Sequence, residues 1–475
     1  MDGSAPRVSV IIPTHNRAAI LGATVESVLA QTHPAVEILV VDDGSSDDTA
    51  AVVGRRGERV VYLRQENRGV EAARKHGLVR SSGRYVNFLD DDDLMAPAKL
   101  ARQVALLEAD PRLGVVHCRY HYVDAAGRHL ETVGRQPQGD VLPQLVWGCF
   151  PWSGGPLVRR ECLVGIGDEE HRDWHGDWGM WLRTALGGWQ WGCVQEPLGS
   201  YRMLPGSMTD AKVANCERLV CNILDEVFSR WTLPPAVVAE RDRIRAGWFF
   251  WLACRYYLGG HPAEGARCLR AALALEPALA ADPALLLEQL RQDALTPRVR
   301  VHGPLRLLAA VFDGLPDEAA FLRPHRSRLE ARVLVGLALR SWGAGEREDA
   351  RRQLVAAVAA DPVLVARPDA FRDELVAWAQ RLPDLAPAAY VARVLAELPP
   401  AAVALAAVRA RALSDLGVAA ALRPGGIGGQ GRRLAAGVLT ALRHRPSLLL
   451  TGPRRLAAEL VRRITGSVGS GDVAR

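Results

Sequence analysis

The chain has 475 residues, of which 24% are charged, and its formal net charge is +6 at pH 7. This length is sufficient for two or three domains with their own cores, and the mild positive charge does not indicate a nucleic-acid-binding protein. The eight cysteines form no Cys-x-x-Cys pair and no metal-ligand spacing, which predicts free thiols in a reducing compartment. Without a signal segment or an apolar run near the ~20 residues that span a bilayer, we expect a cytoplasmic protein.

The first part of the chain alternates between β-branched apolar runs and amphipathic segments. This alternation predicts a mainly parallel α/β sheet with right-handed crossovers. The polar turns that follow the strands should collect in one crevice at the carboxyl edge of the sheet. We expect strands at residues 8–12, 36–41, 60–63, 85–89 and 114–118, helices at 18–31 and 70–80, and a hairpin at 120–130.

Four consecutive carboxylates, Asp90 to Asp93, follow the strand at residues 85–89. Four adjacent aspartates would be costly in a packed core, so we expect them where the strand surfaces, facing water or a cation. Carboxylates two residues apart can offer oxygens to one Mg²⁺ or Mn²⁺ ion together with substrate phosphates. Taken alone, the run is also typical of a solvated acidic loop.

The motifs of the N-terminal half together resemble the family 2 glycosyltransferases. The resemblance covers about residues 7–207 and rests on the strands at 8–41 with Asp42-Asp43-Gly44-Ser45, on Asn67-Arg68-Gly69 and on Phe88 to Asp93. It implies a GT-A (Rossmann-like) fold with a mixed, mainly parallel sheet. The implied activity is transfer of a sugar from a nucleotide-diphosphate donor, with UDP as the expected nucleotide, to an acceptor hydroxyl with inversion at the anomeric carbon.

The resemblance also implies a donor site. Asp43 would accept a hydrogen bond from the base; the alternative is a turn residue that bonds its own backbone, because Asp-Gly is a common turn pair. Arg74 would face the pyrophosphate or be solvated, and Trp152 would stack on a sugar or belong to the core. The residues assigned to the nucleotide sugar are Pro13, Thr14, Asn16, Arg17, Asp42, Asp43, Arg74, Asp90, Asp91 and Trp152.

The family's Asp-x-Asp pattern is matched by Asp90 and Asp92, the implied ligands of Mn²⁺ or Mg²⁺. Asp92 is the expected direct contact, and Asp90 also lies toward the sugar or ribose. Many relatives carry a metal-binding histidine two residues after Arg202, where this chain has Leu204. The metal would then be held by Asp92 and the phosphates.

The acceptor hydroxyl must also lose a proton to a base. Asp177 matches the base position of the family, within His175-Gly176-Asp177-Trp178. The glutamate that precedes this aspartate in relatives is replaced by Gly176. The alternative for Asp177 is the N-cap of the helix that carries Trp178.

Beyond about residue 207 the composition changes to Ala, Leu, Arg and Pro, which predicts a helical region. We expect domains at 1–210 (catalytic), 211–425 (helical) and 426–475 (a basic amphipathic segment). Residues 248–277 and 334–362 share a pattern of small residues and a terminal acid-Pro pair, which resembles tetratricopeptide-type hairpins; a generic bundle is the alternative. Either arrangement favours docking of a protein partner or self-association.

The arginine-rich segment 432–466 either lies on an anionic membrane face or is a solvated helix. Two functions follow from the whole sequence. One is a metal-dependent glycosyltransferase that acts on a glycan, a lipid-linked or a small-molecule acceptor. The other is an interaction protein whose GT-A domain has weakened catalysis, which the replacements at Gly176 and Leu204 would allow.

Overall fold

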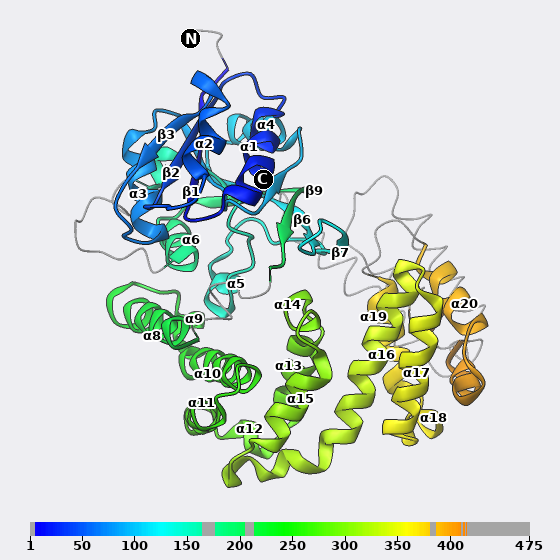
Figure 1. Ribbon diagram of the computed structural model, residues 1–475. Helices are drawn as coiled ribbons and strands as arrows, with labels where there is room; N and C mark the ends of the chain where they lie inside the picture. The colour runs from blue at the N-terminus through cyan, green and yellow to red at the C-terminus, as the bar shows by residue number, and fades with distance from the viewer. Residues whose placement is uncertain are drawn as a thin grey trace, which may run out of the picture. The chain divides into compact units, whose positions relative to one another are not determined.

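The computed structural model describes residues 5–163, 176–204, 213–380, 386–409, 412, 413 and 415. The chain forms two compact units (Figure 1). The first contains residues up to 286 together with 296–321, and the second contains 287–295 and the residues from 322 onward. The last strand of the sheet ends at Arg202, and the compact unit that holds the sheet includes helices up to residue 321. The predicted segment 426–475 lies outside the described residues.

The first unit is built on a nine-stranded mixed sheet with the order β3-β2-β1-β4-β8-β6-β9-β5, and β7 pairs with β6. β1 pairs in parallel with β2 and β4, β2 with β3, and β6 with β9, while β5, β7 and β8 pair antiparallel. The prediction of a mixed α/β sheet is therefore confirmed. The strands are β1 (Val8–Thr14), β2 (Val36–Asp42), β3 (Val61–Arg64), β4 (Tyr85–Phe88), β5 (Leu94–Met95), β6 (Leu113–Val123), β7 (His129–Thr132), β8 (Leu157–Arg159) and β9 (Gln190–Arg202).

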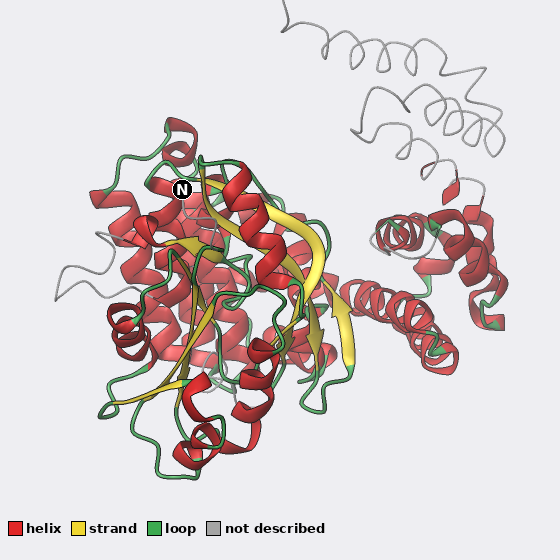
Figure 2. Ribbon diagram, turned by 90° about the horizontal axis from the view of Figure 1, so that it is seen from above, coloured by secondary structure: helices red, strands yellow, loops and turns green. Residues whose placement is uncertain are grey.

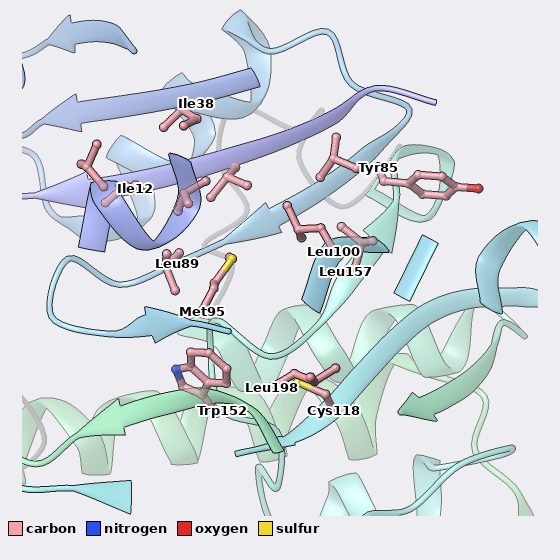
Figure 3. Close-up of a cluster of buried hydrophobic side chains, with 14 of the residues drawn as sticks. Ile12, Ile38, Tyr85, Leu89, Met95, Leu100, Cys118, Trp152, Leu157 and Leu198 are labelled. Atoms are coloured by element: carbon pink, nitrogen blue, oxygen red, sulfur yellow. The ribbon is translucent and has the colours of Figure 1, made fainter. Parts of the chain in front are cut away.

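Helices pack around these strands, as Figure 2 shows in red and yellow. α1 turns Leu21, Val25 and Val28 toward the sheet, where each is at most 1% exposed. Burying a side chain of this kind contributes about 1.5–3 kcal/mol. The core continues through Trp152 and the other residues drawn in Figure 3. The helices are α1 (Ala18–Leu29), α2 (Thr49–Gly54), α3 (Val70–Arg80), α4 (Lys99–Ala109), α5 (Leu142–Trp147) and α6 (Gly176–Leu186).

The carboxyl ends of β1, β2 and β4 lie at one edge of the sheet. Thr14 at the end of β1 is in register with Asp42 at the end of β2, and Ile11 is in register with Phe88, two residues before the Asp run. The turns after β1 and β2 and the residues that follow β4 thus meet at this edge of the sheet, where the crevice is expected.

Helices that follow the sheet in the chain complete the first unit. The indole of Trp248 stacks on Trp178 with a centroid distance of 4.2 Å, and the Arg298 guanidinium donates to the Tyr201 hydroxyl at 2.9 Å. These contacts attach helical segments to α6 and β9. The helices are α8 (Val213–Arg230), α9 (Pro235–Ala239), α10 (Arg241–Leu258), α11 (Pro262–Leu275), α12 (Ala278–Ala281), α14 (Pro297–Arg300) and α15 (Pro304–Asp313).

The second unit is helical. Its core includes the fully buried Trp342, Phe371 and Tyr390, and Arg291 pairs there with Glu374 at 2.8 Å. Its elements are parts of α13 (Ala284–Ala294) and of a 3-10 segment (Asp317–His325), then α16 (Arg326–Ala344), α17 (Arg347–Ala360), α18 (Val363–Ala366), α19 (Asp369–Ala379), α20 (Pro387–Ala396) and a second 3-10 segment (Pro400–Val408). Among the described residues, no helix is both long and apolar enough to cross a bilayer.

The helical region contains an internal repeat with an offset of 85 residues. Gly260 corresponds to Gly345, and both have positive φ; Pro277 corresponds to Pro362. Each copy holds a long helical hairpin, a short helix and a further helix: α10 to α13 in the first copy and α16 to α19 in the second. The predicted helical hairpins are confirmed, but the offset is not a multiple of the 34-residue tetratricopeptide period.

Candidate active site

Asp42 organises the turn after β2. Its side chain is fully buried, and it accepts hydrogen bonds from the Ser45 N–H at 2.7 Å and the Tyr62 hydroxyl at 2.5 Å. Burial acts to raise the pKa of Asp42, but these hydrogen bonds and the charge of Arg64 outweigh it and lower the pKa. Asp42 is therefore an ionised carboxylate that holds the turn.

Asp43 connects the same turn to the start of α3. Its carboxylate, 5% exposed, accepts hydrogen bonds from Gln65 Nε2 at 2.8 Å, Arg68 N at 2.9 Å and Gly69 N at 2.8 Å. A carboxylate offers about four acceptor positions. Asp43 thus fixes the 65–69 loop with three of these positions.

The turn after β1 carries Thr14, whose hydroxyl donates to Asp91 Oδ2 at 2.6 Å. Asn16 has a left-handed backbone with φ of 54°, and it binds the second turn through Ser45 Oγ at 2.9 Å and the Ser46 N–H at 2.8 Å. Pro13 lies before them, buried in β1. The hydrogen bonds of Thr14 and Asn16 connect the first turn to the Asp run and to the turn after β2.

The Asp run is divided between buried and accessible carboxylates. Asp93 is fully buried, which corrects the expectation that all four carboxylates face water or a cation. It accepts hydrogen bonds from the Arg202 N–H at 2.9 Å and from the Trp152 indole N–H. Burial, reinforced by the charges of Asp90 and Asp92, raises the pKa of Asp93 well above its usual range. The buried carboxyl group is therefore protonated and neutral, and its hydrogen bonds replace those to water.

Asp90, Asp91 and Asp92 are all partly exposed, unlike Asp93. Burial raises the pKa of Asp91 to about 7, and burial with the nearby charge of Asp90 raises the pKa of Asp92 to about 6. The Asp92 side chain is 19% exposed, and Arg17 Nη1 lies 4.0 Å from its carboxylate. Crowded carboxylates with raised pKa values are stabilised in the ionised form by a cation.

The donor set near Asp92 fits a metal that takes further ligands from a substrate. No group of three His, Cys, Asp or Glu side chains suited to a metal occurs among the described residues. Mg²⁺ and Mn²⁺ are commonly held by one or two carboxylates plus phosphates. Asp92 fits this role, while Asp90 already uses one oxygen for Arg74 and the other for Ser153.

Arg74 joins the Asp run to α6. Its guanidinium pairs with Asp90 Oδ1 at 2.7 Å and also contacts the carboxylate of Asp177. With 4% exposure, Arg74 is buried and not solvated. Arg74 thus forms a bridge between two carboxylates that lie 87 positions apart in the chain, Asp90 and Asp177.

Asp177 is the second residue of α6, which begins at Gly176. It therefore lies within the first turn, one position after the helix starts. Burial raises the pKa of Asp177 although the charge of Arg74 opposes the shift, and a raised pKa suits a carboxylate that has to accept a proton. His175, the polar neighbour considered from the sequence, lies outside the described residues.

Trp152 is 3% exposed and belongs to the hydrophobic core. Its indole N–H donates to Asp93, and the Lys99 ammonium lies 5.9 Å from its ring centroid. The burial of Trp152 fits the alternative in which its ring belongs to the core, and its indole N–H holds the Asp93 carboxyl group.

Several residues of the site were not identified from the sequence. Their contacts join positions far apart in the chain: Ser153 Oγ donates to Asp90 across 63 positions, and Arg202 Nε donates to the Asp92 carbonyl across 110. Asp93 is the fourth aspartate of the run, and the family pattern Asp-x-Asp assigns no role to it. An aspartate beyond the pattern was therefore a sequence signal for a separate role. The residues to which the sequence assigned no role in the site are Tyr62, Gln65, Glu71, Ser153 and Arg202.

Comparisons with known proteins match the part of the chain that contains the turns after β1 and β2 and the Asp run. The model of the family described as glycosyl transferase family 2 matches residues 9–133. TuaG of Bacillus subtilis strain 168, named as a putative teichuronic acid biosynthesis glycosyltransferase, is 31% identical over 216 residues, which are 44% of this chain and 83% of that protein. A glycosyltransferase of Rickettsia bellii is 36% identical over 146 residues, 30% of this chain; the chain thus spans only 21% of the length of that relative.

Solved structures give a weaker match. The mannosyltransferase PcManGT from Pyrobaculum calidifontis, in complex with GDP-Man and Mn²⁺, is 23% identical with a TM-score of 0.40, over 66% of this chain and 88% of that one. Staphylococcus aureus TarS residues 1–349, in complex with UDP-GlcNAc, is 15% identical with a TM-score of 0.39, over 74% of this chain and 90% of that one. The family match, residues 9–133, contains the strands and turns that form the crevice.

Proposed function

Because this chain belongs to glycosyl transferase family 2, we propose that it transfers a sugar from a nucleotide-diphosphate donor to an acceptor hydroxyl with inversion at the anomeric carbon. The observation that carries the proposal is the Arg74 bridge between Asp90 and Asp177. It brings Asp90, the first carboxylate of the Asp run, and the candidate base to one side chain, as a single displacement at a sugar carbon requires.

The donor nucleotide would lie in the crevice between the turns after β1 and β2. Asp43 keeps one acceptor position, which suits the N–H of a uracil ring and favours UDP. Thr14, Asn16 and Arg17 line the neighbouring turn, and Arg17 is the partly exposed cation beside Asp92. Direct hydrogen bonds of this kind orient a bound nucleotide.

In the proposed reaction, Asp177 accepts the proton of the acceptor hydroxyl, and the acceptor oxygen forms a bond to the anomeric carbon. The bond between that carbon and the diphosphate oxygen breaks, and the nucleoside diphosphate leaves with the electron pair. Arg74 can release Asp177 when the donor arrives and turn its guanidinium to the developing negative charge.

A divalent cation, Mn²⁺ or Mg²⁺, would be held by Asp92 with the donor phosphates, and Asp90 would be its second carboxylate. Such an ion supplies stabilisation of negative charge on the leaving diphosphate. The raised pKa of Asp92, about 6, supports this assignment, because a carboxylate crowded by burial and by Asp90 gains most from a cation.

The acceptor is proposed to be a glycan, a lipid-linked intermediate or another glycoconjugate of the cell surface. TuaG, 31% identical to this chain, is named for teichuronic acid biosynthesis. The helical region, with its 85-residue repeat, would dock a protein partner or a second copy. A cytoplasmic location with contact to the inner membrane face would bring the enzyme to lipid-linked acceptors.

The test is release of UDP from UDP-glucose, UDP-N-acetylglucosamine and UDP-galactose in Mn²⁺, with the wild type and Asp177→Asn. We expect Asp177→Asn to lower kcat at least about a hundred-fold while the dissociation constant of UDP stays the same. Asp48→Asn, an exposed aspartate whose side chain caps no helix, is the control and should match the wild type. Equal turnover by Asp177→Asn and the wild type would refute the assignment of the base.

A further inference from the structure

The α6 helix begins without the glutamate that the family resemblance leads one to expect before Asp177. Gly176 occupies that position with φ of 67°, a left-handed backbone conformation that favours glycine. A glutamate there would be strained whatever space surrounds it. The start of α6 in this chain is therefore built differently, and a carboxylate must come from elsewhere if one is needed.

A carboxylate does reach this point, from α3. Glu71 Oε1 accepts a hydrogen bond from the Gly176 backbone N–H at 2.6 Å, across 105 positions of the chain. Glu71 is partly buried and lies in the first turn of α3. A carboxylate at a helix N-terminus satisfies an otherwise unpaired N–H and interacts favourably with the helix dipole.

The same helix supplies the second contact to the start of α6. Arg74 lies three residues after Glu71, so the two side chains project from one face of α3. Glu71 binds the backbone of Gly176, and Arg74 binds the carboxylate of Asp177. Two successive residues of α6 are thus held by two neighbouring side chains of α3.

We propose that Glu71 is a positioning residue that replaces, from α3, the glutamate missing at position 176 and fixes the place of Asp177 for proton transfer. The inference rests on the proposed function, because it assigns Glu71 to the base of that reaction. Glu71 acts through the Gly176 N–H: it fixes the first turn of α6 and, with it, the backbone from which the Asp177 side chain extends. A misplacement of about 1 Å at such a group can lower a rate about a hundred-fold.

The chain offers a graded set of variants. Glu71→Gln keeps an oxygen that can accept the Gly176 N–H, whereas Glu71→Ala removes the acceptor. Glu58→Gln changes an exposed glutamate in the same unit and is the matched control. Each variant is compared with the wild type and Asp177→Asn for kcat and KM of UDP-sugar turnover in Mn²⁺, for UDP affinity and for the midpoint of thermal unfolding.

We expect Glu71→Ala to lower kcat about ten- to a hundred-fold, with UDP affinity and KM for the donor within a factor of two of the wild type. Glu71→Gln should recover most of the lost kcat, and Glu58→Gln should match the wild type. A merely structural role would instead lower the unfolding midpoint and donor affinity together, and this result would overturn the inference.

Two further outcomes separate the inference from the proposed function. If the wild type is active, Asp177→Asn is inactive and Glu71→Ala keeps full kcat, the base assignment stands and the role of Glu71 is refuted. If the wild type turns over none of the UDP-sugars and binds none of UDP, GDP and TDP, the proposed function fails and the role of Glu71 in it fails as well.

Discussion

The guanidinium of Arg74 contacts the carboxylate of Asp177, although 103 positions separate the two residues. Arg74 comes from α3 and Asp177 from the first turn of α6, and Asp90 binds the other side of the same guanidinium at 2.7 Å. One buried cation thus connects Asp90, the first carboxylate of the Asp run, to the candidate base. The site depends on this contact more than on any single motif.

Replacing Arg74 by alanine should destabilise the first unit and inactivate it. The substitution leaves Asp90 and Asp177 facing each other without the cation between them, and removing one partner of a buried ion pair costs about 3–5 kcal/mol. We expect a loss of about 3 kcal/mol, since both carboxylates keep some exposure. Chemical denaturation followed by tryptophan fluorescence measures this loss. Arg80→Ala, exposed at the end of the same helix, is the control, and equal stability of the two variants would contradict the bridge.

The pKa of Asp91 predicts how stability changes with pH. Burial raises this pKa to about 7 in the folded protein, above the ordinary value of about 3.9. The folded state therefore prefers the protonated form, so the contribution of Asp91 to stability is fully present below about pH 4 and is lost as the pH rises through about 7. In metal-free buffer, Asp91→Asn should remove this part of the decline and stabilise the protein at pH 8 by about 1 kcal/mol.

The measurement is the denaturation midpoint of the wild type and Asp91→Asn at pH 5 and at pH 8 in the presence of a chelator. The amide oxygen that this substitution introduces can still accept the Thr14 hydroxyl, so the hydrogen bond is retained while the titration is removed. A wild type that becomes more stable relative to Asp91→Asn between pH 5 and pH 8 would contradict the raised pKa.

Gly199 in β9 leaves room for the ring of Trp152. A Cβ atom at position 199 would overlap two carbons of that ring, and Trp152 cannot move away easily because it is buried and donates to Asp93. Gly199→Ala should therefore destabilise the protein by about 1–3 kcal/mol. The midpoint of thermal unfolding checks this, with Gly134→Ala as the control, since nothing lies within 4 Å of a Cβ there. A Gly199→Ala protein as stable as the control would contradict the close packing.

Local patterns were enough to locate the elements that carry the site. The helix expected at residues 70–80 is observed as α3 (Val70–Arg80), and the strands before the two turns and the Asp run are β1, β2 and β4. Their apolar runs are long and bounded by polar residues, and a local pattern of this kind is enough to predict a strand or a helix. The polar turns then follow from the parallel topology, which puts strand ends at one edge.

The pairing of side chains could not be predicted in the same way. Glu71 lies in the helix predicted at residues 70–80, and nothing near it in the sequence points to Gly176, 105 positions away. The burial of Asp93 depends on Trp152 and on the backbone of Arg202, which approach only in the folded sheet. Contacts of this range are set by tertiary packing, which single-sequence patterns do not contain.

The helical region could be predicted from the sequence in part. Its helices follow from composition, and the acid-Pro pairs at Pro277 and Pro362 mark the ends of α11 and α17. The shared pattern of residues 248–277 and 334–362 was visible in the sequence, and the positive φ values of Gly260 and Gly345 have the same offset of 85 residues as the acid-Pro pairs. Its length reflects the additional helices in each copy, α12 and α13 in one and α18 and α19 in the other.

The most direct test of the account is calorimetric titration of UDP, GDP and TDP into the wild type and Asp92→Ala, with and without Mn²⁺. Asp48→Ala serves as the exposed control. The account predicts that UDP binds in the presence of Mn²⁺, that binding weakens without the ion, and that Asp92→Ala abolishes the Mn²⁺-dependent part. Failure of all three nucleoside diphosphates to bind the wild type would contradict the proposed donor site.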